Sequence, residues 1–368
     1  KPIEDKIPDF SEFDNFNSIW SNSIKKIVLV GVLEPDSLEQ KYVELLAEDK
    51  SVLMLSESTS NLHHKNIIPS IDKLIGALSE DEFKQLQPDV LLTVGGLVVS
   101  KKIKQFLRTY APKQHFHLGE HTANNTFYIL NYWFKMPLNT FFKTWQNSYQ
   151  PVKSDFQNFW INEMSSRRVK HSDYLDRIPF SDFKAFDEII KQIPDYYQIQ
   201  SANSSIIRYL QLFDLNATNT VFCNRGTSGI DGSTSTAIGA ATISKKPTLC
   251  ITGDLSFLYD SNALWNNYIP KNFKIIIINN AGGGIFRILP GHKNTDNFDT
   301  YFETKHYLNA QHLAKMYGFN YSKAEGVIEL EKNLTSFFSS NNTTQILEVF
   351  TPSQLNDDIL LSYFKAIK

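Results

Sequence analysis

Three segments of the chain combine glycine with oxygen-bearing side chains, and each directly follows an apolar stretch that predicts a β-strand. They are 224–232 (NRGTSGIDG), 253–256 (GDLS) and 280–284 (NAGGG). Glycine lets backbone N–H groups approach a phosphate closely, and Asp and Asn supply the oxygen atoms that a hard cation prefers. Together the three segments predict a site for a diphosphate and a divalent cation.

The protein ligands of that cation follow from the residue types. Mg²⁺ takes about six oxygens in an octahedron, a few from protein and the rest from phosphate and water. The carboxylate of Asp254, the amide oxygen of Asn280 and the carbonyl of Gly282 form such a set, and Mn²⁺ is an alternative ion for it. Each segment taken singly also has a plain structural explanation, because a glycine loop is an ordinary turn and Asp254 fits a helix cap. Three such segments after successive strands favour the cation and diphosphate site over ordinary turns.

The elements around these segments alternate between strand and helix. In the second half we expect strands at 220–223, 248–252, 274–279 and 345–350, and helices at 204–213, 232–244, 256–267, 310–317, 328–338 and 357–366. In the first half we expect strands at 27–30, 52–55 and 90–94, and helices at 37–47 and 101–110. This rhythm predicts parallel sheets with helices on both faces, and ligands bind such sheets beyond the carboxyl ends of the strands.

The length of 368 residues suits two domains. The fold class predicted is therefore α/β, with two Rossmann-like parallel-sheet domains at 1–175 and 176–368. Residues 112–180 are rich in aromatic side chains and show no clear period, so a linker is placed around 150–185. The first residue is Lys, and we expect the chain to begin inside a longer protein.

Composition excludes several classes of partner. The 37 basic and 39 acidic residues leave a net charge of −2, so no global field attracts nucleic acid or an anionic membrane. The longest apolar stretch, 90–99, is far shorter than the ~20 residues that cross a bilayer, so no integral membrane segment is expected. Two cysteines suit a reducing compartment, and a cytoplasmic location is predicted.

The motifs resemble those of thiamine diphosphate (ThDP) enzymes, in which Gly-Asp is followed after about two dozen residues by Asn-Asn. The strings 224–232, 253–260 (GDLSFLYD) and 279–286 (NNAGGGIF) are most similar to those of the 2-succinyl-5-enolpyruvyl-6-hydroxy-3-cyclohexene-1-carboxylate synthases of menaquinone synthesis. The resemblance implies a central domain at 1–175 and a diphosphate-binding domain at 176–368. The family's N-terminal pyrimidine-binding domain and its catalytic glutamate are expected to be missing, which would leave this chain an inactive fragment.

The resemblance also assigns roles at the cofactor site. Asp254, Asn280 and Gly282 match the Mg²⁺ ligands, and Ile230 matches the apolar wedge that bends ThDP for catalysis. The cofactor-binding residues implied are Ser228, Gly229, Ile230, Gly253, Asp254, Leu255, Ser256, Asn280, Gly282 and Ile285.

The substrates implied are 2-oxoglutarate and isochorismate. The family decarboxylates the first and adds the succinyl-semialdehyde unit to the second by 1,4-addition. Arg provides the bidentate geometry that carboxylates need, and Asn203-Ser204-x-x-x-Arg208 and Asn224-Arg225 match substrate-binding positions. The substrate-binding residues implied are Lys101, Lys102, Ser204, Arg208, Arg225, Phe286 and Leu289.

Two alternatives stay open beside this synthase. One is another ThDP-dependent 2-oxoacid decarboxylase of the acetolactate-synthase type, and the other is a non-catalytic cofactor-binding module. The full-length enzyme is expected to be a homo-oligomer, because family active sites form between subunits.

Overall fold

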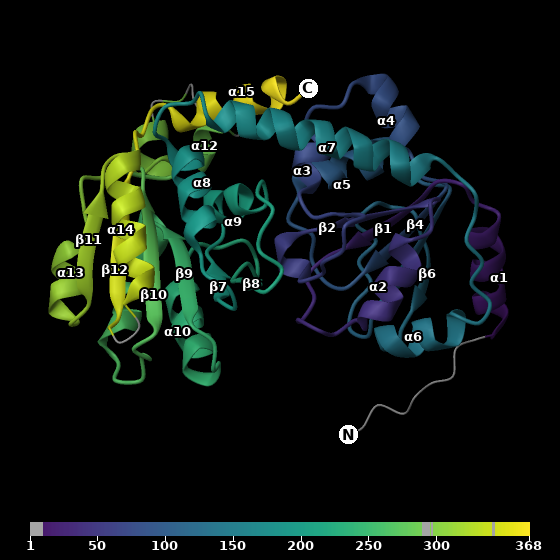
Figure 1. Cartoon of the computed structure of the whole chain (residues 1–368), viewed down its shortest axis with the longest axis horizontal. Helices are drawn as coiled ribbons and strands as arrows, with labels where there is room; N and C mark the ends of the chain where they lie inside the picture. The colour runs from purple at the N-terminus through teal and green to yellow at the C-terminus, as the bar shows by residue number, and fades with distance from the viewer. Residues whose placement is uncertain (1–9, 289–294, 296, 341–342) are drawn as a thin grey trace. The chain divides into compact units, whose positions relative to one another are not determined.

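The computed structural model describes residues 10–288, 295, 297–340 and 343–368, which form two compact units. Unit 1 comprises the residues up to Lys170 together with Lys368, and unit 2 comprises His171–Ile367. In Figure 1 the elements of unit 1 are coloured purple to teal and those of unit 2 teal to yellow. Helix α7 (Phe156–Leu175) occupies most of the segment predicted as a linker and contains the boundary between the units.

Unit 1 contains a six-stranded parallel sheet in the order β3-β2-β1-β4-β5-β6. Its strands are β1 (Lys26–Val30), β2 (Val52–Ser56), β3 (Ile67–Ile68), β4 (Val90–Val94), β5 (Gln114–Leu118) and β6 (Leu130–Phe134). Its helices are α1 (Phe10–Ser21), α2 (Gln40–Ala47), η1 (Ser58–Ser60), α3 (Ile71–Ile75), α4 (Glu80–Leu86), α5 (Lys101–Thr109), α6 (Leu138–Trp145) and most of α7.

Alternate side chains of the central strands enter two separate cores. Val28 and Val30 of β1 pack into one core, and Ile27 and Leu29 pack into the other. A strand buried on both faces explains why its sequence, KIVLV, is an almost continuous apolar run. The core that contains Val28 and Val30 also includes aromatic rings from α1 and α6, among them Phe16, Trp20 and Trp145.

Unit 2 contains a second six-stranded parallel sheet in the order β11-β12-β10-β9-β7-β8. Its strands are β7 (Gln198–Ser201), β8 (Thr220–Cys223), β9 (Thr248–Gly253), β10 (Phe273–Asn279), β11 (Asn320–Ala324) and β12 (Gln345–Phe350). Its helices are α8 (Asp182–Gln192), α9 (Ser205–Leu210), α10 (Ser233–Ile243), α11 (Asp254–Tyr259), η2 (Ser261–Trp265), α12 (Ile285–Ile288), η3 (Phe298–Phe302), α13 (Gln311–Met316), α14 (Val327–Ser339) and α15 (Asn356–Ala366).

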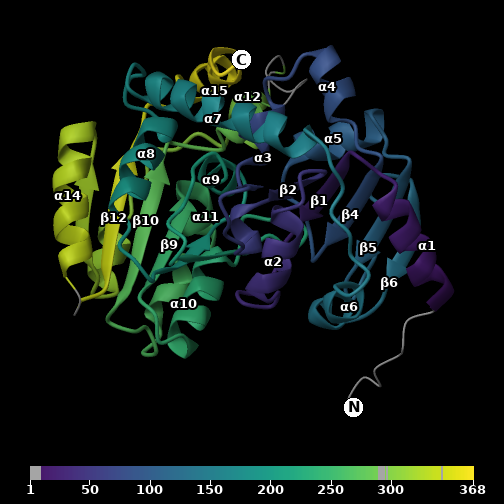
Figure 2. The ribbon, with the colours of Figure 1, turned by 45° about the vertical axis from the view of Figure 1, so that its right-hand side comes forward.

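Both faces of this sheet are covered by helices. Ile275 and Ile277 of β10 pack in one core with residues of α10, α11 and α13. Lys274 points to the opposite face, where its Nζ donates to carbonyls at the end of α14. Helices α14 and α8 lie side by side on that face (Figure 2). The predicted α/β fold with two parallel-sheet domains is confirmed.

Some elements differ from the prediction. The helix expected at 256–267 begins at Asp254, ends at Tyr259 and is followed by the short helix η2. Between the two, the Asp260 carboxylate accepts from the N–H and hydroxyl of Ser235. Strand β7 was not predicted, since its sequence QIQS gives no apolar signal, yet it is buried between β8 and β9. Among the described residues no helix is both long and apolar enough to cross a bilayer.

Candidate functional site

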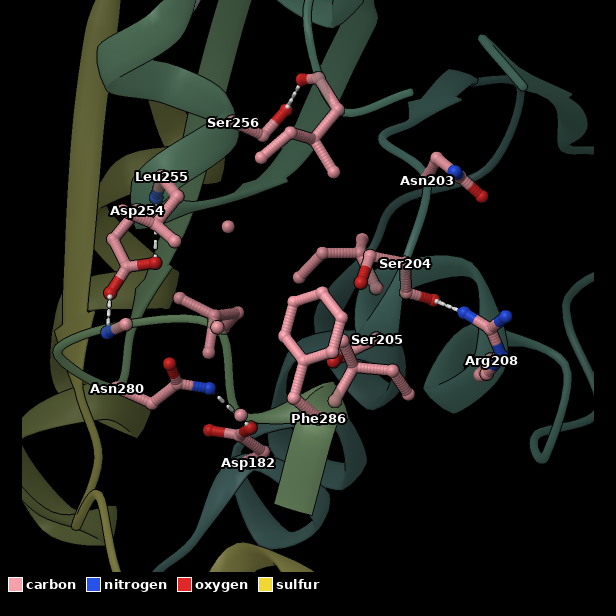
Figure 3. A pocket seen from close by; sticks show the side chains of 18 of the residues that line it. Asp182, Asn203, Ser204, Ser205, Arg208, Asp254, Leu255, Ser256, Asn280 and Phe286 are labelled. Carbon is pink, nitrogen blue, oxygen red and sulfur yellow. Dashed lines mark hydrogen bonds between the residues drawn. The ribbon is translucent and has the colours of Figure 1, made fainter. Parts of the chain in front are cut away.

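A cavity of about 370 Å³ opens at the carboxyl end of the unit 2 sheet. From β7 the chain continues outward to β8, and then returns to β9 on the other side of β7, so the strand order reverses between β7 and β9. Such a reversal is where open parallel sheets place their ligands. Residues after β7, β8, β9 and β10 line the cavity, whose volume is within the range of small-molecule sites (Figure 3).

Asp254 is the first residue of α11, and Gly253 occupies the cap position that the sequence offered to Asp254. Its Oδ1 accepts the N–H of Leu255 at 2.7 Å, and its Oδ2 accepts the N–H of Gly282 at 3.0 Å. The Nε2 of His306 lies 3.2 Å from the same Oδ2, and this carboxylate raises the pKa of His306. The carboxylate is therefore buried and held in one orientation at the edge of the cavity.

Asn280 follows β10 and donates its Nδ2 to Asp182 Oδ2 at 2.8 Å. Within the described part of the chain, its Oδ1 is buried and has no hydrogen-bond partner. Figure 3 shows this side chain and Asp254 on the same side of the cavity. Burial raises the pKa of Asp182 to about 6, and the negative charge of Asp254 adds to the rise. Two buried carboxylates and an amide oxygen make this end of the cavity favourable for a cation.

The backbone of the 280–284 loop requires glycine. Gly282 has φ +148°, a conformation that side chains disfavour, and a Cβ there would stand 2.6 Å from the carbonyl oxygen of Glu303. The N–H of the next residue, Gly283, donates to that same carbonyl at 2.6 Å. The loop is thus seated directly against the backbone of residue 303.

The loop at 228–230 is held in place by polar contacts from two other elements. The Ser256 hydroxyl donates to the carbonyl of Ile230, and the Nδ2 of Asn203 donates to the carbonyl of Gly229 at 3.0 Å. Ser228 has φ +73° and Ser204 has φ +71°, and each stands in the cavity wall. Non-glycine residues rarely adopt such backbone conformations, and they concentrate at functional sites.

Two arginines of unit 2, Arg208 and Arg225, differ in their position relative to the cavity. Arg208 lines the cavity, donates from Nη1 to the carbonyl of Ser204 at 2.6 Å, and lies opposite Asp254 and Asn280 in Figure 3. Arg225 does not line the cavity, and its Nη1 donates to Asn203 Oδ1 at 2.7 Å. Arg208 therefore belongs to the cavity wall itself, whereas Arg225 contacts the wall through Asn203.

The structure brings most of the predicted site residues to this one cavity. Those in its wall are Ser204, Arg208, Ser228, Gly229, Ile230, Gly253, Asp254, Leu255, Ser256, Asn280, Gly282, Ile285 and Phe286. Lys101 and Lys102 lie in the first turn of α5 in unit 1. Leu289 lies outside the described residues.

Among the described residues, sequence reasoning missed two titratable side chains at this site, Asp182 and His306. Asp182 is the first residue of α8 and follows Ser181, whose hydroxyl caps the helix by accepting from Lys184, so its sequence signal is that of an ordinary helix start. His306 belongs to an irregular stretch with no motif. Asp182 is recognised as a site residue only through its hydrogen bond with Asn280, which lies 98 residues later in the sequence.

Comparison with known proteins matches the family "thiamine pyrophosphate enzyme, C-terminal TPP binding domain" to residues 204–349. The 2-succinyl-5-enolpyruvyl-6-hydroxy-3-cyclohexene-1-carboxylate synthase of Flavobacterium psychrophilum is 50% identical over 365 residues, which cover 99% of this chain and 65% of that protein. The synthase of Flavobacterium johnsoniae is 50% identical over 375 residues, with 99% and 68% covered. That of Porphyromonas gingivalis is 34% identical over 366 residues, with 95% and 63% covered.

The chain thus spans about two thirds of the length of the curated relatives it matches. The matched thiamine pyrophosphate domain contains the loops after β8, β9 and β10 and therefore most of the cavity wall. On these similarities, the chain belongs to the 2-succinyl-5-enolpyruvyl-6-hydroxy-3-cyclohexene-1-carboxylate synthase family.

Proposed function

We propose that this chain forms the central and diphosphate-binding parts of a ThDP- and Mg²⁺-dependent synthase, which decarboxylates 2-oxoglutarate and adds the succinyl-semialdehyde unit to isochorismate. The observation that carries the proposal is the convergence of Asp254, Asn280 and Gly282 on one cavity, in a chain about 50% identical to synthases of that name. The domain division at 1–175 and 176–368 is part of the proposal.

The residues present fit a divalent cation. The Asn280 Oδ1 is a buried acceptor for which the described residues supply no donor, and a cation would satisfy it. Its neighbour Asp254 supplies a buried negative charge, and carboxylate and amide oxygens suit Mg²⁺ or Mn²⁺. A cation held there would also offset the repulsion between Asp254 and a bound diphosphate.

The residues present also fit the rest of the cofactor. Gly253, Gly283 and Gly284 leave the wall beside the cation ligands free of side chains, so a diphosphate could approach the backbone closely. Ile230 supplies an apolar surface whose position is set by the Ser256 hydroxyl. Bound ThDP would supply the electron sink that makes decarboxylation of a 2-oxoacid feasible. The chain's own residues bind and orient the reacting groups.

Carboxylate recognition is assigned to the other side of the cavity. Arg208 offers a planar guanidinium that suits a substrate carboxylate, and Phe286 contributes apolar wall beside it. Arg225 supports the same wall by fixing Asn203. The proposed roles of Lys101, Lys102 and Leu289 rest on the family resemblance alone.

We also propose where the enzyme acts and how it assembles. We place the enzyme in the cytoplasm, because two cysteines among 368 residues suit a reducing compartment. We propose that it is a homo-oligomer, because the family it resembles forms its active sites between subunits.

The proposal is tested with an enzyme of full family length that contains this chain. With ThDP and Mg²⁺, CO₂ release from 2-oxoglutarate should be detected, and the coupled product should form once isochorismate is added. Chelation of the metal should abolish both. Faster turnover of pyruvate than of 2-oxoglutarate would favour an acetolactate-type decarboxylase, and ThDP binding with no turnover of either acid would favour a non-catalytic module.

A further inference from the structure

We infer that Asp182 is a positioning residue, which fixes the amide orientation of Asn280 so that its oxygen, rather than its nitrogen, faces the cation site. The inference rests on the proposed function and concerns how the metal ligand is presented. Asp182 lies 98 residues from Asn280 in the sequence and contacts it through one hydrogen bond.

The geometry around Asp182 leaves its carboxylate little freedom. Its Oδ2 accepts from Asn280 Nδ2 at 2.8 Å, and its Oδ1 accepts from the Thr351 hydroxyl. Its backbone N–H donates to Asn356 Oδ1 at 2.8 Å, and the residue is 2% exposed. Thr351 follows β12, so the residue after that strand holds the carboxylate against the β10 loop, whereas Asn356 contacts only the backbone of Asp182.

This arrangement selects one of the two orientations of the Asn280 amide. A carboxylate that accepts on both oxygens has no hydrogen to offer, so it pairs with the Nδ2 group and repels the Oδ1. Turning the amide over would place two acceptors in contact inside a buried site, and neither could donate a hydrogen bond to the other. The oxygen is therefore directed away from Asp182, on the side where Asp254 lies, as Figure 3 shows.

A purely structural role explains these contacts less well. A buried carboxylate is expensive to desolvate, and an apolar residue of similar volume commonly stabilises a core as well or better. Here the carboxylate lines the cavity, and the partner it orients carries an oxygen with no donor among the residues described. Residues that orient metal ligands in this way typically change metal affinity about 10–100-fold when they are removed.

The test measures Mn²⁺ affinity by electron paramagnetic resonance, with ThDP present, in an enzyme of full family length. Asp182→Leu and Asp182→Asn both remove the negative charge, but only Asn keeps a hydrogen-bond acceptor for Asn280. We expect Asp182→Asn to bind Mn²⁺ at least tenfold more tightly than Asp182→Leu. Equal losses in the two variants would mean that Asp182 acts through charge alone, and this would overturn the inference.

Two further variants test whether misfolding, or the loss of any buried hydrogen bond nearby, could explain the result. Asp182→Ala removes the same acceptor without adding bulk, so it decides the question should the leucine variant fail to fold, and the same loss relative to Asp182→Asn is expected. Asn356→Ala is the matched control, because it removes a buried hydrogen bond to the Asp182 backbone but leaves the carboxylate in place. Its Mn²⁺ affinity should stay within threefold of wild type, and a loss as large as that of Asp182→Leu would contradict the inference.

Failure of the proposed function has a different signature. If the wild-type enzyme shows no ThDP-dependent Mn²⁺ binding, the proposed cofactor site is wrong. If the wild-type enzyme binds Mn²⁺ and the Asp182→Leu and Asp182→Asn variants do so equally, only the role of Asp182 is wrong.

Discussion

The backbone N–H of Gly282 donates to Asp254 Oδ2 at 3.0 Å, and so ties the loop after β10 to the first residue of α11. Strands β9 and β10 are neighbours in the sheet, so strand pairing brings together Asp254 and Gly282, two of the three proposed cation ligands, and this bond joins them. The loop can make the bond because Gly282 adopts φ +148° against the carbonyl of Glu303.

Gly282→Ala should therefore disable the site. A Cβ would meet the Glu303 carbonyl oxygen at 2.6 Å in a backbone conformation that alanine disfavours, which costs about 1–3 kcal/mol of strain or displaces the loop. We expect Mn²⁺ affinity in the presence of ThDP to fall at least tenfold, measured by titration.

Gly239→Ala is the matched control for this substitution. Gly239 lies in the interior of α10 with open space around it, so alanine should stabilise the helix by about 0.5–1 kcal/mol and leave metal binding unchanged. Normal metal affinity in the Gly282→Ala variant would show that the loop tolerates a side chain and that the bond to Asp254 is dispensable.

Arg208→Lys should weaken carboxylate binding although it keeps the charge. Lysine cannot form the bidentate contact, and loss of a charged hydrogen bond costs about 1.5–3 kcal/mol, roughly ten- to a hundredfold in apparent affinity. Steady-state kinetics should show this in the KM for 2-oxoglutarate or isochorismate. Arg177→Lys, at an exposed i,i+4 pair with Asp173, is the control and should change neither constant. Two unchanged KM values for Arg208→Lys would make this arginine structural.

Ser256→Ala tests how Ile230, the proposed apolar wedge, is held in place. The hydroxyl donates to the carbonyl of Ile230 inside a buried site, and such a bond contributes about 1 kcal/mol. We expect ThDP affinity to fall about fivefold, measured by cofactor titration. Ser165→Ala removes a comparable hydroxyl-to-carbonyl bond on the exposed face of α7 and should leave ThDP affinity unchanged. Equal ThDP affinity in both variants would argue that the Ile230 loop is held by its other contacts.

The free energy of unfolding should depend on pH through the protonation of Glu57. Burial raises the pKa of this carboxyl from 4.5 to about 7, although it accepts the N–H groups of Val99 and Ser100 at 2.7 Å. Between these two pKa values the folded state keeps a proton that the unfolded state has lost. The free energy of unfolding of unit 1 should therefore fall as pH rises from about 4.5 to 7, by roughly 3 kcal/mol from this group, and level off above.

Glu57→Gln supplies the check. The amide does not titrate, so the thermal midpoint of the variant should vary less between pH 5 and 7.5 than that of wild type. The variant should be less stable at pH 5, because one of the two N–H groups loses its acceptor. A wild-type midpoint that rises with pH through this window, unchanged in the variant, would show that Glu57 is ionised throughout.

Local patterns in the sequence were sufficient for much of the fold. The apolar runs that form β1, β4 and β10 are buried on both faces, and this is why they read clearly as strands of a parallel sheet. The glycine and oxygen-bearing segments after β8, β9 and β10 could be predicted to meet because parallel strands present their carboxyl ends at one edge. Asp254, Asn280 and Gly282 were found in this way.

Contacts between residues that are far apart in the sequence became visible only in the tertiary structure. Strand β7 has a polar sequence and exists because β8 and β9 pair with it on either side, and its insertion places Ser204 and Arg208 at the cavity. Asp182 has the local signal of a helix start, and its partner Asn280 is far away in the sequence. Residue types and spacing therefore determined which groups could bind a cofactor. Which atom of Asn280 is left without a hydrogen-bond partner among the described residues depends on the buried bond to Asp182, a contact that sequence spacing does not encode.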